Sequence, residues 1–128
     1  MPKPAPPPKP TAAELDLLRV LWPLGSATVK DVHEAARRDK ADLSYATVLR
    51  LMQVMHGKGL LLRDESQRSH VYAPAHARES MRGNLLKELI HKAYAGSGKE
   101  LVMAALRGHV SAAERAEIQR FLEDTRDD

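Results

Sequence analysis

The most informative stretch of this chain reads Leu43-Ser44-Tyr45-Ala46-Thr47-Val48-Leu49-Arg50-Leu51-Met52-Gln53-Val54-Met55-His56-Gly57-Lys58-Gly59. Ser44 suits the N-cap of a helix, because its hydroxyl can accept a free backbone N–H of the first turn. Gly59 suits the left-handed position at which a helix ends. Between them, apolar residues recur at the spacing of a core-facing stripe: Val48, Leu51, Met52 and Met55.

The opposite face of this predicted helix is short-chained or polar near its start and carries a guanidinium one turn further on. Its residues are Ser44, Ala46, Thr47, Arg50 and Gln53. A capped helix of this kind, followed directly by a hairpin, is typical of a helix that reads the DNA major groove beside a wing. An ordinary amphipathic surface helix has the same pattern, so the flanking chain has to distinguish the two interpretations.

Two further helices are predicted before this stretch. Thr11 and Glu14 have the spacing of a capping box, and Pro23 with Gly25 closes the first helix. Thr28 begins the second helix. The residues that we expect to face the core are Leu15, Leu18, Leu21 and Trp22 in the first helix and Val32, Ala35 and Ala36 in the second.

After Gly59 the pattern changes to two short strands, residues 60–64 and 70–73, around a polar loop that carries Arg68 at the tip of the hairpin. Because an isolated hairpin is only marginally stable, it must pack on the helices. We expect this contact to come from Leu60, Leu62, Val71 and Tyr72. Three helices and a hairpin are the plan of a winged helix-turn-helix domain, here residues 11–76.

Residues 77–128 are predicted to be helical again, with helices at 77–94 and 99–107 and a last one opened by the capping-box pair Ser111 and Glu114. About fifty residues are too few to enclose a core unaided, so a second copy of the chain is the simplest partner surface. Packing on the first domain is the alternative. The candidate dimerisation residues are Leu85, Leu89, Leu101, Val102, Leu106, Ile118, Phe121 and Leu122.

The charges are unevenly placed along the chain. The totals are 20 Lys and Arg against 17 Asp and Glu, a formal charge of +3 and a pI near 9.3. Residues 37–70 hold seven basic residues against four acidic ones, whereas residues 114–128 hold six acidic against three basic. The middle of the chain is therefore compatible with nucleic acid phosphates, and the C-terminal end is not.

Residues 1–10 contain six prolines and are predicted to be a disordered, extended arm. This arm is either a passive tail or a phosphate contact through Lys3 and Lys9. No apolar run approaches the roughly 18 residues that span a bilayer, and the N-terminus lacks the apolar core of a signal peptide, so we expect a cytoplasmic protein without a membrane partner.

Enzymatic chemistry has no support in the sequence. The chain has no cysteine, its six histidines show no close metal-ligand spacing, and Ser44 has no evident base and acid partner. No glycine-rich phosphate loop follows a strand. We therefore expect no catalytic residues, no metal and no cofactor.

Several segments together resemble the penicillinase-repressor family of transcription regulators. They run in order from Thr11 to about Leu122: Thr11-Ala12-Ala13-Glu14-Leu15, Val20-Leu21-Trp22, Thr28-Val29-Lys30-Asp31-Val32, Ser44-Tyr45-Ala46-Thr47-Val48, Lys58-Gly59-Leu60-Leu61, Arg68 and Tyr72-Ala73-Pro74. The resemblance implies a homodimeric winged-helix repressor on a palindromic operator, with C-terminal helices that join the subunits. It places Ser44, Thr47 and Arg50 at the groove and Arg68 at the backbone.

The resemblance does not extend to the signals that such repressors sense. Copper-responsive members carry a cysteine-rich C-terminus, which this chain lacks. β-Lactam-responsive members are cut by a sensor protease at an Asn-Phe pair, and Leu101-Val102-Met103-Ala104-Ala105 contains none. A sensor protease is therefore not implied as a partner.

We predict a mainly α protein with a small β-hairpin that binds operator DNA as a homodimer and represses transcription. The candidate DNA-binding residues are Ser44, Tyr45, Ala46, Thr47, Arg50 and Arg68. A winged-helix module that binds proteins instead of DNA is the alternative. Steep salt dependence of binding would distinguish DNA from a protein partner.

Overall fold

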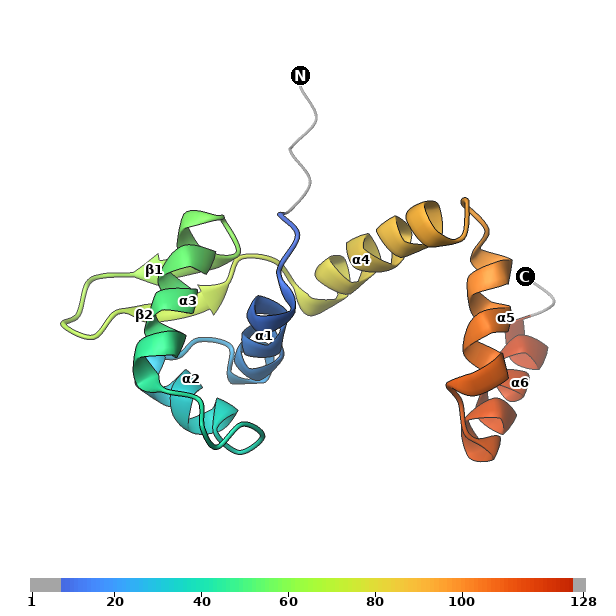
Figure 1. The fold of residues 1–128 in the computed structure, drawn as a ribbon, viewed down its shortest axis with the longest axis horizontal. Coiled ribbons are helices and arrows are strands. Elements are labelled where there is room, and N and C mark those ends of the chain that lie inside the picture. The colour runs from blue at the N-terminus through green and yellow to red at the C-terminus, as the bar shows by residue number, and fades with distance from the viewer. Residues whose placement is uncertain (1–7, 126–128) are drawn as a thin grey trace, which may run out of the picture. The chain divides into compact units, whose positions relative to one another are not determined.

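The structure, a computed structural model, describes residues 8–125 and divides into two compact units, one up to Gly83 and one from Asn84 onward (Figure 1). In the described range the elements are α1 (Ala12–Leu24), α2 (Val29–Ala36), α3 (Tyr45–Gly57), β1 (Leu61–Asp64), β2 (Val71–Pro74), α4 (Arg78–Ala93), α5 (Gly98–Gly108) and α6 (Ala112–Thr125). This order confirms the predicted mainly α fold with a hairpin. Residues 1–7 of the predicted arm lie outside the described residues.

Local capping interactions set the start of each helix in the first unit. Thr11 Oγ1 accepts the backbone N–H of Glu14 at 3.2 Å, and Glu14 Oε1 accepts that of Thr11 at 2.9 Å. Thr28 and Asp31 form the same reciprocal pair at the start of α2. The capping box predicted for α1 is thus confirmed, and Thr28 begins α2 as expected.

The predicted cap, end and core stripe of α3 are confirmed. Ser44 Oγ accepts the backbone N–H of Thr47 at 3.1 Å. Gly59 has a φ of 85°, and the N–H that follows it, from Leu60, donates to Met55 O at 2.9 Å. Three residues of the stripe are buried, Val48, Met52 and Met55, and Leu51 is half-buried.

Of the residues predicted to pack the hairpin on the helices, Leu60 and Tyr72 are buried and Val71 is half-buried, but Leu61 takes the place predicted for Leu62. Leu62 was expected to face the core, and it is 60% exposed. Side chains alternate across a strand, so burying Leu61 turns Leu62 outward and brings Arg63 opposite the buried Tyr72. Leu60 precedes the strand and is buried as well.

An isolated β-bridge at Ala27, absent from the sequence prediction, joins the hairpin. Ala27 lies between α1 and α2, and its N–H donates to Tyr72 O at 2.9 Å while its carbonyl accepts the N–H of Tyr72 at 2.8 Å. This bridge fixes the wing to the segment that begins α2. It gives the marginal hairpin backbone partners in addition to its apolar contacts.

The core of the first unit extends into the first turn of α4. The largest fully buried side chains include Leu18, Leu21, Val32, Tyr72 and Met81. Met81 belongs to α4 yet is 2% exposed within this unit. The predicted inward residue Trp22 is half-buried, and its Nε1 donates to His76 O at 3.0 Å. The domain boundary predicted between residues 76 and 77 stays a prediction.

In the second unit the cap predicted for the last helix is present, but the apolar faces of α5 and α6 remain open. Ser111 and Glu114 form the predicted capping box at 2.7 and 3.1 Å. Within the described chain, α5 and α6 contain no buried residue. Among the candidate dimerisation residues, Leu89, Val102, Phe121 and Leu122 are exposed and Leu85, Leu101, Leu106 and Ile118 are half-buried.

Candidate nucleic-acid interface

The exposed strip of α3 carries three of the six predicted DNA-binding residues. Its solvent-facing side chains lie opposite the buried stripe: Ala46, Thr47, Arg50, Gln53 and Val54. A major groove about 12 Å wide admits an α-helix, and the side chains that reach base edges are those of such a strip. In the described chain Arg50 forms no ion pair, so its guanidinium is available to a ligand.

Ser44 and Thr47 have unequal capacities for contacting DNA. The Ser44 hydroxyl accepts the Thr47 N–H and donates its own hydrogen to Thr47 Oγ1 at 2.9 Å. A hydroxyl has one donor and two acceptor positions, so Ser44 keeps only an acceptor. Thr47 keeps its O–H. Of the two, Thr47 is therefore the one that can donate to a base or a phosphate, and Ser44 mainly caps the helix.

His33 on α2 fixes the start of α3, a role that sequence analysis did not detect. Its Nε2 lies 2.7 Å from Leu43 O, and since a carbonyl only accepts, this nitrogen carries the hydrogen. The His33 ring also meets the Tyr45 ring edge-on, with centroids 5.8 Å apart. This contact holds the Tyr45 ring in place, while 47% of the residue stays exposed to solvent.

Glu14 and Lys58 fix the other end of α3. Lys58, the C-cap residue, donates to Glu14 Oε1 at 2.6 Å, and Glu14 is only 2% exposed. Burial raises the pKa of Glu14, but the hydrogen bonds from Lys58 and Thr11 outweigh it and leave the pKa below its ordinary value. The carboxylate therefore stays charged and links α1 to α3.

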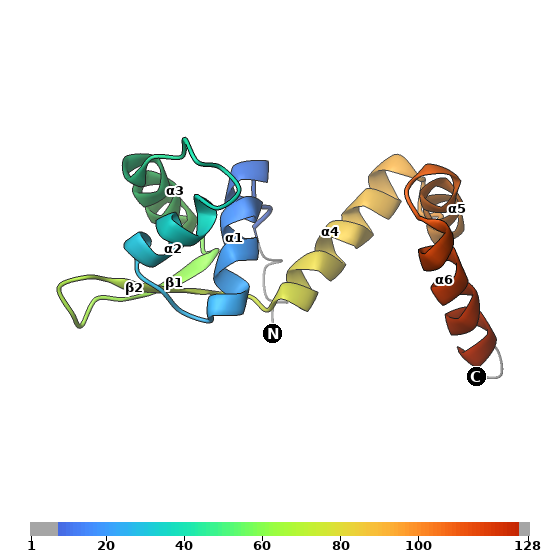
Figure 2. The same ribbon diagram turned by 90° about the horizontal axis from the view of Figure 1, so that it is seen from below.

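A groove brings the wing together with α2 and α3. Its lining includes Lys30 at the start of α2, Tyr45 and Gln53 on α3, and Arg68 and His70 on the wing. Both views show the hairpin loop extending beyond these helices (Figure 1, Figure 2). Of the predicted set, Tyr45 and Arg68 line this groove.

The groove includes residues that were missing from the predicted set. Gln53 was placed on the polar face of α3 but not among the binding residues, and neither Lys30 nor His70 was predicted to bind DNA. Ser44, Ala46, Thr47 and Arg50 lie outside the groove lining, on α3 or at its cap. The 45, 49, 53 spacing along α3 is the sequence signal that could have pointed to Gln53.

The two arginines of the hairpin have different environments. Arg63 pairs with Glu65 at 3.1 Å, and a hydrogen bond to Tyr72 raises its pKa. Only 23% of its side chain is exposed, so it belongs to the inner face of the hairpin. Arg68 is exposed and, within the described residues, forms no ion pair. It is the hairpin cation that can meet a phosphate.

Neither a metal-ligand cluster nor a membrane-spanning helix is found among the described residues. Among residues 8–125, no three His, Asp or Glu side chains gather as ligands for a metal ion. The described helices are all too short or too polar to cross a bilayer.

The sequence matches known proteins over most of its length. The model of a family described as penicillinase repressor matches residues 10–124. Two relatives, each named transcriptional regulator BlaI and each from a strain of Mycobacterium tuberculosis, are 33% identical over 97 residues, covering 74% of this chain and 68% of theirs.

One solved structure has a similar fold. The solution structure of the DNA-binding domain of the repressor BlaI matches with a TM-score of 0.51 at 23% identity. The match covers 58% of this chain and 89% of that domain. It supports the winged-helix arrangement of the first unit.

Proposed function

This chain belongs to the penicillinase repressor family of transcriptional regulators, and we propose that it represses transcription by binding operator DNA as a homodimer. The observation that carries the proposal is the arrangement of α3 and the wing. One exposed helix face and one exposed hairpin cation flank a groove, and both ends of the helix are held on the core. Repression then requires only that the bound protein occlude a promoter in the cytoplasm, with no catalysis.

On this model α3 enters the major groove and the wing follows the backbone. Arg50 then pairs with a guanine edge, and Thr47 donates to a base or a phosphate. Gln53 has the donor and acceptor pair that suits adenine. Arg68, at the tip of the hairpin, meets a phosphate and adds affinity without reading sequence.

The open apolar faces of the second unit support a homodimer. Phe121 and Leu122 are 65% and 59% exposed, and Leu89 and Val102 are each 49% exposed. Several large apolar side chains exposed on one small helical unit favour an interaction site, and a second copy of the chain covers them with a self-complementary interface. A twofold dimer presents two α3 helices, so the operator should be palindromic.

The test is binding to the DNA upstream of the chain's own gene, measured by fluorescence anisotropy over a range of salt concentrations and located by footprinting. Phosphate contacts make log K fall linearly with log salt, by about 0.9 for each contact. We expect a steep slope and a protected site with twofold symmetry. A salt-independent interaction, or no protection anywhere upstream, would contradict the proposal and favour a protein partner.

A further inference from the structure

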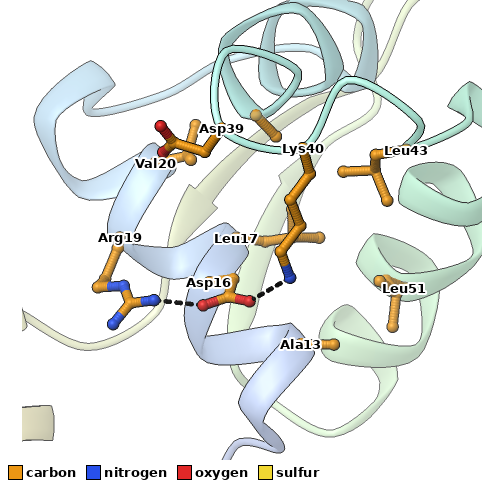
Figure 3. A pocket seen from close by; sticks show the side chains of 10 residues that line it. Ala13, Asp16, Leu17, Arg19, Val20, Asp39, Lys40, Leu43 and Leu51 are labelled. Carbon is orange, nitrogen blue, oxygen red and sulfur yellow. Dashed lines mark hydrogen bonds and ion pairs between the residues drawn. The ribbon is translucent and has the colours of Figure 1, made fainter.

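A cavity of about 240 Å³ lies between α1, α3 and the turn of residues 37–43 that joins α2 to α3 (Figure 3). The apolar part of its lining includes Leu17, Leu43 and Leu51. Leu51 lies on a different face of α3 from the residues that line the groove beside the wing. The cavity is therefore separate from the candidate DNA interface, although α3 forms a wall of both.

The two cations at this cavity can shift toward a ligand at a small free-energy cost. Lys40 reaches from the turn to Asp16 on α1 at 2.8 Å, and Arg19 pairs with the other oxygen of Asp16 (Figure 3). The Lys40 and Arg19 side chains are 58% and 65% exposed. Exposed ion pairs contribute little to stability, so moving these two side chains has a small free-energy cost.

The shape and charge of the cavity indicate the class of ligand. An apolar cavity of about 150 Å³ holds benzene, so this one has room for a single ring with a substituent. The lining carries two carboxylates as well as two cations: Asp39, on the turn, and Asp16, both of whose oxygens already accept a hydrogen bond. A guanidinium has five N–H donors and an ammonium three, so Arg19 and Lys40 each keep donors to spare. An added carboxylate can use these donors while the pairs to Asp16 remain.

We propose that this cavity binds a small amphipathic carboxylic acid, with its apolar body against Leu17 and Leu51 and its carboxylate on Arg19 and Lys40. The ligand acts on the turn that leads into α3. This turn carries Leu43, whose carbonyl is held by His33 at 2.7 Å, and it ends at the N-cap Ser44. A ligand in contact with Leu43 and Lys40 favours a different position of this turn, and with it of the start of the reading helix.

The bound acid thereby lowers affinity for the operator, which makes the cavity an effector site. This consequence rests on the proposed function, whereas the binding site itself does not. Allosteric coupling of ordinary strength changes affinity by about 5- to 150-fold, and we expect the loss of DNA affinity to fall in that range.

Binding is tested first without DNA, on the full chain, by amide chemical shifts. The probes are benzoate, its neutral analogue benzamide and the cation benzylamine, all at constant ionic strength. We expect saturable shifts centred on residues 13–20 and 36–43, with benzoate binding about 3- to 10-fold more tightly than benzamide. Absence of saturable binding, shifts centred elsewhere, or equal or tighter binding of benzamide or benzylamine would overturn the proposal.

Two variants with matched controls test the geometry. Ala13 is exposed and lines the cavity, so Ala13→Met fills it without a large change to the core; Ala12→Met adds the same side chain outside the lining. Ala13→Met should abolish benzoate binding and Ala12→Met should not. Arg19→Gln removes one of the two cations and should reduce the preference for benzoate over benzamide, whereas Arg82→Gln, at an exposed position of α4, should leave this preference unchanged. If a variant and its matched control changed benzoate binding equally, the proposed position of the ligand would be wrong.

The coupling is tested with promoter DNA. Benzoate should weaken DNA binding by the wild-type chain and have no such effect on Ala13→Met. Saturable benzoate binding with unchanged DNA affinity would refute the effector role. If the wild-type chain failed to bind DNA at all, the proposed function would fall, while the shift data would still decide whether the site exists.

Discussion

Removing the charge of Glu14 or of Lys58 should destabilise the first unit by unequal amounts, and removing both should cost less than the sum. Glu14→Gln retains an acceptor for the Thr11 N–H and almost the same volume. It loses a charge-assisted hydrogen bond worth about 1.5–3 kcal/mol, partly offset because no charge remains to be buried. The Lys58 side chain, 34% exposed, can turn into water. We expect a net loss of about 1–1.5 kcal/mol.

Lys58→Met is the more damaging change, because it leaves a nearly fully buried carboxylate with only the Thr11 N–H and Thr11 hydroxyl nearby. Breaking a buried ion pair from one side costs about 3–5 kcal/mol, and the partial exposure of Lys58 moves the expectation to about 2–3 kcal/mol. The double variant buries no charge and should lose about 1–2 kcal/mol. The coupling energy between the two positions is then about 2 kcal/mol.

The assay is denaturant unfolding followed by the fluorescence of Trp22, the only tryptophan of the chain. Trp22 lies in the first unit and donates to His76 O, so its signal reports that unit alone. The exposed pair Arg82 and Glu79, in the part of α4 that belongs to the first unit, is the control, and Arg82→Met should cost no more than about 1 kcal/mol. Additive losses for Glu14→Gln and Lys58→Met would refute the reasoning.

Acid provides a second, independent check on the same pair. The folded state holds the pKa of Glu14 below its ordinary value of 4.5, so the unfolded chain takes up the proton first as pH falls. The stabilisation is complete above the ordinary value and is lost as pH falls through the folded-state value. Glu14→Gln should lack this component. In Lys58→Met the effect of burial on the pKa of Glu14 is no longer outweighed by the hydrogen bond from Lys58. Mild acid should therefore reduce the difference in unfolding free energy between this variant and the wild-type chain.

Three further predictions concern DNA binding and assembly. Arg50→Ala should cost about 1–3 kcal/mol on the cognate operator and much less on random DNA, and equal losses on both would show a phosphate contact only. Arg68→Ala should weaken binding to the operator and to random DNA by the same factor, and it should make the slope of log K against log salt shallower by about 0.9. An unchanged slope would show that the wing does not contact DNA. Phe121→Asp places a charge on an exposed apolar face and should give a monomer in sedimentation, with operator affinity lower by about 10²–10⁴-fold. Glu123→Ala is the control and should stay dimeric. A dimeric Phe121→Asp chain would contradict the assignment of α6 to the dimer interface.

The wing shows where reasoning from the sequence fails. Leu60, Leu61 and Leu62 are consecutive and chemically identical, so hydrophobicity alone does not tell which of them face the core. A shift of one residue in a strand exchanges its two faces. The choice depends on pairing with β2, where Leu61 opposes Pro74 and Leu62 opposes Ala73, and the result is a wing with Leu62 exposed.

The sequence by itself determined the features that arise between near neighbours. Thr11 with Glu14, Ser44 with Thr47, and Ser111 with Glu114 are three residues apart, and a helix brings such pairs into contact wherever it forms. The left-handed glycine after α3 and the buried stripe of that helix follow from the same local geometry. So does the exposed position of Arg50, which lies opposite the stripe.

Only the tertiary structure decided the contacts that join distant segments. Glu14 meets Lys58 across 44 positions of sequence, Ala27 pairs with the backbone of Tyr72, and Lys40 crosses from the turn to Asp16. The cavity beside Leu51 and the grouping of Gln53 with the wing have the same origin. Each depends on how whole elements pack, and packing is set by the shape of the complete core, which no local spacing specifies.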